Sequence, residues 1–385
     1  MKIAICYHYL ALYRLPIFHQ LVNSDVARYE IFSGTTSDDD LQKIDPRLST
    51  VPLSQGGLRW AFLRNHWLMK KRFLWQSGLF KVVMDSSFDA YIFLGSPYHI
   101  STWACTLIAN FRGKKTFFWM HGVNSTKPSF KDKMNIFLFY RLPHGFFLYG
   151  NRAKLIMSQF SHLSKKQTYV IFNSLDYDQS KRARQDLSIE DFLRFRVNHF
   201  EKTHLPIVIA IGRVNKIKRL DLLLEVNSIH KTETGQPLFN FLVVGDGSEL
   251  DHLKRFSGVL GLDTYTKFFG ACYDEEINGK LIMHSDLCVV PGEIGLTSIH
   301  SLSFGTPVIS HNNLNIQAPE VESIIPGKTG DFYEFANIKD LRRSISDWFT
   351  KYPHKSKSLM SECYSVIDSV YNPEFQMKVF NSAFH

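Results

Sequence analysis

The chain has 385 residues, of which 44% are hydrophobic and 21% are charged, a composition typical of globular proteins. This length suffices for two domains with separate cores, and the composition excludes a disordered or low-complexity chain. The formal net charge of +9 favours anionic ligands or surfaces in general, but no RNA- or DNA-binding motif accompanies it, so we expect no nucleic-acid partner.

The cysteines and the N-terminal segment predict the compartment. Five scattered cysteines without a CxxC pair disfavour a disulfide framework or a zinc site and indicate a reducing cytosol. The first residues resemble a secretion signal, but His8 and Arg14 interrupt the apolar patch and no small-residue cleavage site follows. No apolar run reaches the ~18 residues that span a bilayer. We therefore predict a cytoplasmic protein, either free or peripheral on the inner face of the plasma membrane.

The first half of the chain alternates strand and helix patterns. Short apolar runs predict strands, and helical patterns start at 13–22 and within 96–111. Such alternation is typical of βαβ units around a parallel sheet. The expected strands are 1–8, 29–34, 88–95, 114–122, 145–150 and 168–173.

Segments 59–75 and 127–141 both interleave basic and large aromatic residues. Basic heads with aromatic anchors suit docking to an anionic membrane. The alternative is an amphipathic helix that packs its aromatic residues into the core and leaves its charges in solvent. Periodicity does not separate a core face from a lipid face, so both interpretations stay open here.

A polar, charged segment at 174–204 with a helical period predicts the linker between two domains. A second series of strands and helices follows it, with glycines at the strand ends, which is typical of a doubly wound sheet. Two such domains would leave a cleft that faces the carboxyl ends of both sheets. The expected strands are 205–212, 239–247, 266–270, 286–292 and 306–310, and the expected helices are 219–230, 248–258, 274–285 and 296–305.

The loop after the first strand of this series carries candidate ligand-binding residues. Gly212 lies at the end of a buried strand, and Arg213 and Lys218 flank a tight loop that leads to a helix. Two fixed cations beside a helix start suit a diphosphate. The alternative is a pair of solvated loop charges, and we expect Lys216 and Arg219 to be bystanders.

A second loop, at 292–295, contains two glycines and leads into a helix whose first turn holds Thr297 and Ser298. Free N–H groups at such a turn can donate hydrogen bonds to phosphate oxygens. A purely structural strand–turn–helix would look similar but needs no second glycine.

These motifs, in this order and spacing, resemble glycosyltransferase family 4 of the GT-B class. The resemblance covers most of the chain and is strongest from Ile207 to Phe332. It implies a GT-B fold of two Rossmann-like, doubly wound α/β domains that face a cleft. Residues 1–180 would bind the acceptor, with a terminal helix at 371–385 packed back on them, and 181–370 would bind a nucleotide sugar. The matching motifs are Gly212-Arg213 with Lys218, LDLLL, VVGDG, FFG, SDLCVVPG, Gly295-Leu296 and FGTPVI, with YRLPIF, WMHG and YNPEFQ outside the strongest region.

The resemblance also implies a role for each matching residue. Arg213 and Lys218 would hold the donor diphosphate, and the backbone near Ala271 and Cys272 would meet the base. His121 would lie beside the transferred sugar, where it can polarise a hydroxyl; a structural histidine at a strand end is the alternative. The loop residues that would face the sugar and phosphates are Glu293, Gly295, Leu296 and Thr297.

The chain departs from the family pattern at the ribose contact. The family usually carries two glutamates separated by seven residues, and this sequence has Gly292 and His300 at those positions. Glu293 lies one residue off, and counting from it reaches Ser301. His300 can still hydrogen-bond a ribose hydroxyl, so we interpret it as a variant of that contact. The glycine-rich loop that often follows the first strand is replaced by Leu10–Tyr13.

The implied activity is that of a retaining hexosyltransferase. It would move a sugar from a nucleoside-diphosphate sugar to a saccharide or a polyprenyl-diphosphate-linked acceptor in surface polysaccharide biosynthesis, such as lipopolysaccharide O-antigen or capsule. These motifs contain no carboxylate nucleophile, and the resemblance implies that the leaving phosphate itself helps to deprotonate the acceptor. We expect no metal and no other cofactor, because side-chain cations would neutralise the diphosphate.

Three alternatives remain at this stage. Asp38-Asp39-Asp40 resembles the DxD metal motif of the GT-A class, although a solvated acidic turn fits its polar surroundings better. A GT-B-like nucleotide-sugar epimerase would need no acceptor. A catalytically inactive sugar-binding scaffold subunit would tolerate the missing glutamates.

Overall fold

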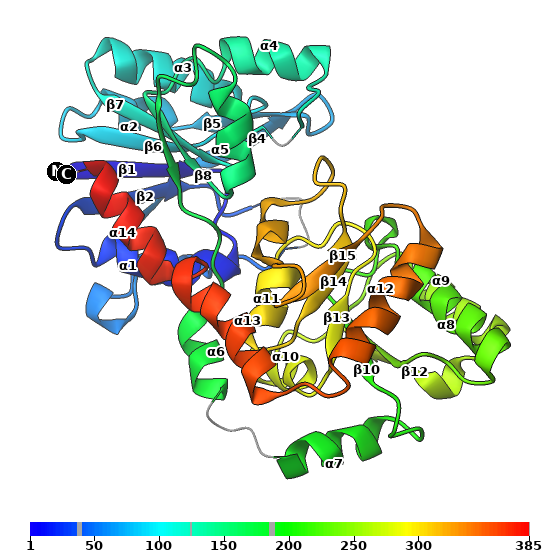
Figure 1. Ribbon diagram of the computed structural model, residues 1–385. Coiled ribbons are helices and arrows are strands. Elements are labelled where there is room, and N and C mark those ends of the chain that lie inside the picture. Colours follow the sequence, from blue (N-terminus) through cyan, green and yellow to red (C-terminus); the bar gives the residue numbers. More distant parts are fainter. Residues whose placement is uncertain (37–40, 124, 185–188, 385) are drawn as a thin grey trace. The chain divides into compact units, whose positions relative to one another are not determined.

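The computed structural model describes residues 1–36, 41–123, 125–184 and 189–384, and it divides into two compact units. Unit 1 comprises 1–176 and 370–385, and unit 2 comprises 177–369. Each unit is a parallel sheet covered by helices (Figure 1). The expected class, two Rossmann-like α/β domains, is confirmed.

The sheet of unit 1 contains seven parallel strands among the described residues, in the order β3-β2-β1-β6-β7-β8-β9. Consecutive strands move outward in one direction from β1 and then in the other from β6, as in a doubly wound sheet. The strands predicted for this half are all present. The bounds are β1 (Lys2–Tyr7), β2 (Arg28–Ser33), β3 (Trp60–Phe62), β6 (Ala90–Leu94), β7 (Lys115–Met120), β8 (Gly145–Leu148) and β9 (Gln167–Val170).

Helices cover both faces of this sheet (Figure 1). One face packs against α1 (Leu15–Val22) and the terminal helix α14 (Pro373–Phe384), whose Phe380 ring contacts the rings of Tyr29, Trp119 and Phe147. A separate hydrophobic cluster on the other face includes residues of α2, α3 and α5. The bounds of these helices are α2 (Leu79–Met84), α3 (Ile100–Phe111) and α5 (Asn151–Ser158).

Of the two interpretations of 59–75, the amphipathic core helix is wrong. This segment forms β3, then β4 (Arg64–Leu68), and β4 pairs antiparallel with β5 (Phe73–Ser77). The chain reverses because Met69, Lys70 and Lys71 all adopt positive φ, at 48°, 53° and 67°. Aromatic residues fit a pleated surface as well as a helix face, so the composition of this segment was compatible with either structure.

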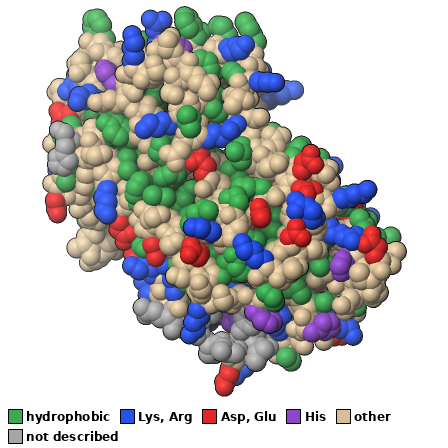
Figure 2. All heavy atoms as spheres, in the orientation of Figure 1, with side chains coloured by type: hydrophobic (Ala, Val, Ile, Leu, Met, Phe, Trp, Pro, Cys, Tyr) green, Lys and Arg blue, Asp and Glu red, His purple; other side chains and the backbone are tan. Residues whose placement is uncertain are grey.

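The segment 127–141 does contain a helix, α4 (Phe130–Leu138), which starts at a capping box formed by Ser129 and Asp132. Its aromatic residues do not pack inward as a core helix would require. Ile136 is the one residue of the helix that is buried. Hydrophobic and basic side chains instead alternate along the edge of unit 1 where α3 and α4 lie (Figure 2).

The sheet of unit 2 contains six parallel strands among the described residues, in the order β12-β11-β10-β13-β14-β15. All strands and helices predicted for this half are present, and β15 (Gly330–Tyr333) and α12 (Ile338–Lys351) extend the fold beyond them. The bounds are β10 (Ile207–Ile211), β11 (Asn240–Val244), β12 (Thr266–Gly270), β13 (Leu287–Val289), β14 (Val308–His311), α8 (Asp221–Thr234), α9 (Leu250–Val259), α10 (Glu275–Met283), α11 (Thr297–Ser303) and α13 (Lys357–Val370).

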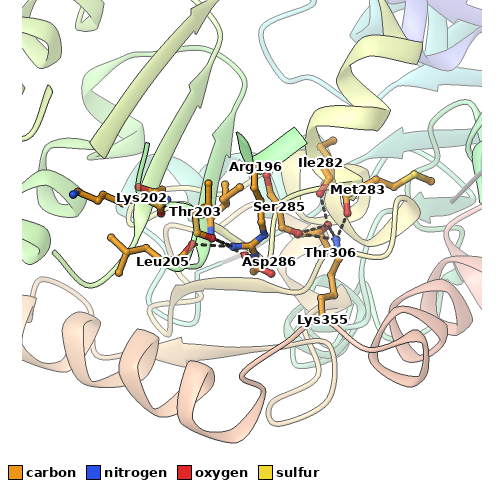
Figure 3. Close-up of polar contacts among 12 residues, drawn as sticks. Arg196, Lys202, Thr203, Leu205, Ile282, Met283, Ser285, Asp286, Thr306 and Lys355 are labelled. Atoms are coloured by element: carbon orange, nitrogen blue, oxygen red, sulfur yellow. Dashed lines mark hydrogen bonds and ion pairs between the residues drawn. The ribbon is translucent and has the colours of Figure 1, made fainter. Parts of the chain in front are cut away.

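The predicted linker contains two helices, α6 (Tyr177–Ala183) and α7 (Ile189–His199). Arg196 of α7 forms an ion pair with Asp286, which precedes β13 and also accepts the Ile207 N–H at 2.7 Å (Figure 3). The partly buried ammonium of Lys355 donates to the Ser285 carbonyl at 2.7 Å nearby. This polar network ties α7 to the amino end of the unit 2 sheet.

Among the described residues, no helix combines the length and hydropathy required to cross a membrane.

Candidate functional site

The topology of unit 2 places a ligand site between β10 and β13. These strands are neighbours, but the chain leaves β10 toward one edge of the sheet and leaves β13 toward the other. Open α/β sheets bind ligands at the carboxyl ends of strands at such a switch point. The loops that follow these two strands, 212–220 and 290–296, are therefore the candidate site.

The first loop begins with a glycine in a conformation that other residues rarely adopt. Gly212 has φ 124° and donates its N–H to the Val244 carbonyl at 2.9 Å. The following side chain, Arg213, is exposed at this edge of the sheet. Lys218 closes a 3-10 turn at Lys216–Lys218, while Arg219 turns away into an ion pair with Asp221 at 3.1 Å.

Lys218 joins the two loops. Its Nζ donates to the carbonyl oxygens of Glu293 at 2.7 Å and Ile294 at 3.1 Å. The backbones also pair directly, because the Gly292 N–H donates to the Lys218 carbonyl at 2.9 Å and the Glu293 N–H to the Ile217 carbonyl at 3.2 Å. The two predicted segments thus form one structural element.

The charge on Lys218 is partly destabilised in the folded protein. Burial lowers its pKa, the nearby Glu293 raises it, and the charge of Arg213 lowers it again, so the net shift is downward. Two cations in close proximity favour an anionic ligand.

The close approach of the loops explains the glycine at 292. A Cβ atom on Gly292 would lie 1.7 Å from the Ile217 carbonyl oxygen, so no other residue fits without moving the backbone. Gln317, which the sequence analysis missed, holds the same loop by accepting the Ile294 N–H at 2.9 Å. Gln317 lies in the loop after β14, and no motif in the sequence indicated that its side chain would contact the 290–296 loop.

Thr297 and Gly295 lie in the same place. The hydroxyl of Thr297 donates to the Ile211 carbonyl at 3.1 Å, and a Cβ on Gly212 would lie 3.5 Å from that hydroxyl oxygen. Gly295 has φ 57°, and a Cβ there would lie 3.9 Å from Lys218 Nζ. Leu296 is the partly buried N-cap of α11. The structure therefore brings together Gly212, Arg213, Lys218, Glu293, Gly295, Leu296 and Thr297.

His300 gains a carboxylate from another helix. Its Nε2 lies 2.7 Å from an Oε1 oxygen of Glu275, the first residue of α10. Burial opposes the charge of Glu275, but His300 and Asn278 outweigh it and hold the pKa of Glu275 below its usual value. No motif predicted a role for Glu275. Asp274, the residue before it, caps α10, so Glu275 is the first carboxylate after Cys272 that is not used as a helix cap.

Ala271 and Cys272 form the loop between β12 and α10. Ala271 is exposed, and the Cys272 carbonyl accepts Asn278 Nδ2 at 3.3 Å. Since Glu275 follows three residues later, this loop lies beside the His300–Glu275 pair. The side chains of His300 and Glu275 and the backbone groups of this loop can form hydrogen bonds with a polar ligand.

His121 belongs to unit 1, where it follows β7. It is exposed, and its ring centroid lies 5.0 Å from that of Tyr149. Arg14, which the sequence analysis did not select, is buried below this edge, with its guanidinium 5.1 Å from the Tyr149 ring and 5.2 Å from the Trp119 ring. A buried guanidinium surrounded by aromatic rings gives this edge a positive field.

Within the part of the chain that the structure describes, no group of three or more His, Cys, Asp or Glu residues could hold a metal ion. Asp38, Asp39 and Asp40 lie outside the described residues.

Residues 191–362 match the family model described as glycosyl transferases group 1. A search of curated protein sequences finds no match. Solved structures are similar over the whole chain. Anabaena Alr3699/HepE in complex with UDP has a TM-score of 0.71 at 15% identity, covering 100% of this chain and 99% of that one.

Two other solved structures show the same similarity. The lipopolysaccharide outer core galactosyltransferase WaaB in its apo form has a TM-score of 0.68 at 15% identity, with coverage of 100% and 99%. A mutant of S. aureus TarM in complex with fondaparinux, α-GlcNAc-glycerol and UDP has a TM-score of 0.63 at 13% identity, with coverage of 100% and 99%. The chain therefore has the GT-B fold.

Proposed function

We propose that the protein is a retaining glycosyltransferase that transfers a hexose from a nucleoside-diphosphate sugar to a saccharide or lipid-linked saccharide. The observation that carries the proposal is the junction of the 212–220 and 290–296 loops, where Lys218 bridges the backbones and Arg213 lies beside it. This junction lies inside the segment that matches the family model.

The chemistry of sugar transfer explains this arrangement. Breaking the glycosidic bond leaves a nucleoside diphosphate whose negative charge increases in the transition state, and preorganised cations stabilise that charge. Arg213 and Lys218 supply them without a metal. His300, backed by Glu275, takes the place of the carboxylate expected at the ribose, and the Ala271–Cys272 backbone meets the base. His121 of unit 1 polarises a hydroxyl at the transferred sugar.

The donor and acceptor classes rest on analogy with proteins of the same fold. HepE has been crystallised with UDP and with UDP-glucose, and WaaB is a lipopolysaccharide galactosyltransferase. We therefore propose a cytoplasmic enzyme of surface polysaccharide biosynthesis that works at the inner face of the plasma membrane.

A transfer assay tests this proposal. Purified full-length protein is incubated with labelled UDP- and GDP-sugars, with and without a polyprenyl-diphosphate-linked saccharide, and the anomeric configuration of the product is read by NMR. We expect acceptor-dependent transfer with retention. Arg213→Ala should lose most of the rate, whereas Lys216→Ala, an exposed cation on the same loop, should keep it.

Other outcomes of the same assay would refute the proposal. Release of a free, altered sugar without acceptor would identify an epimerase. Nucleotide-sugar binding without turnover, unaffected by Arg213→Ala, would identify an inactive scaffold.

A further inference from the structure

Helices α3 and α4 turn large hydrophobic side chains toward solvent. Phe111 is 95% exposed, Phe130 81% and Phe137 53%. Single exposed hydrophobic residues are ordinary on protein surfaces, but a contiguous group marks an interaction site. We define the α3–α4 surface by its exposed hydrophobic residues, which are Ile100, Leu107, Phe111, Phe130, Met134, Phe137 and Leu138.

Helix α3 has the opposite distribution of polar and hydrophobic residues from a helix whose outer face contacts water. Its exposed hydrophobic residues are separated by seven and four positions, which places them on one face. The face it turns toward the protein is made of small or hydroxyl-bearing residues. These buried residues are Ser101, Thr102, Cys105, Thr106 and Ala109.

Helix α4 also carries a row of exposed hydrophobic residues on one face. Phe130, Met134, Phe137 and Leu138 recur at helical spacing on one face, and the helix buries Ile136 alone. Packing against the rest of unit 1 therefore does not account for four large hydrophobic side chains on this helix.

The two stripes belong to one surface. Ile136 of α4 and Cys105 of α3 lie in the same core cluster, so both helices cover the same face of the sheet. Near their starts, Lys131 Nζ donates to the Tyr98 hydroxyl at 2.5 Å. Near their ends, Asn110 Nδ2 donates to the Leu142 carbonyl at 2.8 Å. The two helices therefore run in the same direction over one face of the sheet, and their exposed hydrophobic residues point away from that face.

Basic residues lie on α4 and in the segments next to both helices. Segments 98–115 and 127–141 contain seven Lys and Arg residues and one acidic residue, Asp132. Lysine and arginine next to exposed aromatic residues match the headgroup region of an anionic bilayer, which attracts the cations and admits the rings. We propose that the α3–α4 surface docks on a membrane that contains anionic phospholipid.

The charge of the surface favours lipid over a second copy of the chain. A two-fold dimer interface is self-complementary, so it would bring the same basic residues of both copies together. Seven cations against one anion would then repel across the contact. An anionic lipid surface removes that cost and neutralises the charge.

Vesicle co-sedimentation of the full-length protein tests the inference. Vesicles of phosphatidylcholine alone are compared with vesicles of equal parts phosphatidylcholine and phosphatidylglycerol, at low and high salt. We expect binding to the anionic vesicles and weak binding to the neutral ones. The double variant Phe130→Ser/Phe137→Ser should lower the partition coefficient by roughly tenfold or more. The variant Lys127→Glu/Lys133→Glu should lower the partition coefficient mainly at low salt, where charges are screened least.

Matched controls lie on unit 2. Val259 of α9 is 82% exposed, and Lys339 of α12 is exposed, so Val259→Ser and Lys339→Glu change the same side-chain chemistry elsewhere. Both should bind anionic vesicles as the unmodified protein does. Because all the substituted side chains are exposed, thermal unfolding should stay unchanged in every variant.

Three results would overturn the inference. These are an absence of binding to either vesicle, binding that Phe130→Ser/Phe137→Ser leaves intact, and a concentration-dependent dimer that this variant abolishes. The last would indicate a second copy as the occupant. No donor is present in the experiment, so its outcome is independent of whether the protein transfers sugar.

Discussion

Replacing Lys218 with methionine should affect stability and ligand binding separately. The side chain keeps its length, but the two carbonyl oxygens of Glu293 and Ile294, at 2.7 and 3.1 Å from Nζ, lose their charged donor. A hydrogen bond to a charged group contributes about 1.5–3 kcal/mol, and water can replace part of it at this partly buried site. We expect the free energy of unfolding to fall by about 2 kcal/mol.

Ligand affinity should fall as well. A unit charge about 4 Å from a phosphate oxygen contributes up to ~4 kcal/mol at an effective dielectric constant of about 20. Desolvation of the ammonium offsets part of this gain, so we expect a loss of about 2 kcal/mol, or roughly 30-fold in the Kd for a nucleoside diphosphate. Isothermal titration calorimetry measures the Kd, and denaturant unfolding measures the stability.

The pH dependence separates the ammonium from a general packing effect. Since burial lowers the pKa of Lys218, the folded protein loses this proton at a lower pH than the unfolded chain does. The affinity for a diphosphate should fall as pH rises through the pKa of Lys218 in the folded protein, which lies below the usual value of 10.5. Between those two values the unfolded state binds more protons, so this group makes stability rise with pH. Lys218→Met should abolish both trends.

Lys216→Ala is the control, because Lys216 lies on the same loop and is exposed. It should leave stability and Kd within about 0.5 kcal/mol of the unmodified protein. Lys218→Met with unaltered stability and unaltered nucleotide affinity would refute the role assigned to the loop junction.

The remaining predictions concern Gly292, the loss of stability at acid pH, the ion pair between Arg196 of α7 and Asp286, and the metal requirement. Gly292→Ala should cost at least about 2 kcal/mol of unfolding free energy and weaken nucleotide binding, because its Cβ would lie 1.7 Å from the Ile217 oxygen; normal binding would contradict this. Burial and His8 lower the pKa of His99 to about 3, so the unfolded state binds more protons below the usual pKa of 6.5. Stability should therefore fall by about 2 kcal/mol between pH 6.5 and 5 through this group, and His99→Gln should flatten that fall in denaturant titrations. Asp286→Asn should cost about 3 kcal/mol because it removes the carboxylate from a largely buried ion pair with Arg196, whereas Asp347→Asn at an exposed pair should cost under about 0.5 kcal/mol. Transfer activity should persist in EDTA, and a strict requirement for added manganese would contradict the metal-free site.

Much of unit 2 was predictable because its strands are buried on both faces. Apolar runs such as 207–211 and 241–244 end next to glycines, so hydrophobic pattern and turn residues together predict these strands, although their observed bounds are shorter than predicted. Arg213 and the Gly292–Gly295 loop meet because β10 and β13 are neighbours in the structure, and the carboxyl ends of neighbouring parallel strands share one edge of the sheet.

Other features depend on contacts that one-dimensional patterns do not encode. The hairpin at β4–β5 depends on three consecutive positive-φ residues, Met69 to Lys71, none of them a glycine. The carboxylate beside His300 comes from Glu275, 25 residues earlier in the chain. Arg14 is buried among tyrosine and tryptophan rings, although arginine usually marks a surface position. Tertiary packing decides each of these cases.

The central claim is that the 212–220 and 290–296 loops of unit 2 bind a nucleoside diphosphate. A thermal-shift titration of the full-length chain with UDP, GDP and ADP tests it most directly, because a ligand that binds the folded state raises Tm by mass action. We predict that at least one nucleotide raises the Tm, that Arg213→Ala abolishes the shift, and that Lys216→Ala preserves it. If no nucleoside diphosphate shifts the Tm, or if Arg213→Ala responds as the unmodified protein does, the claim is contradicted.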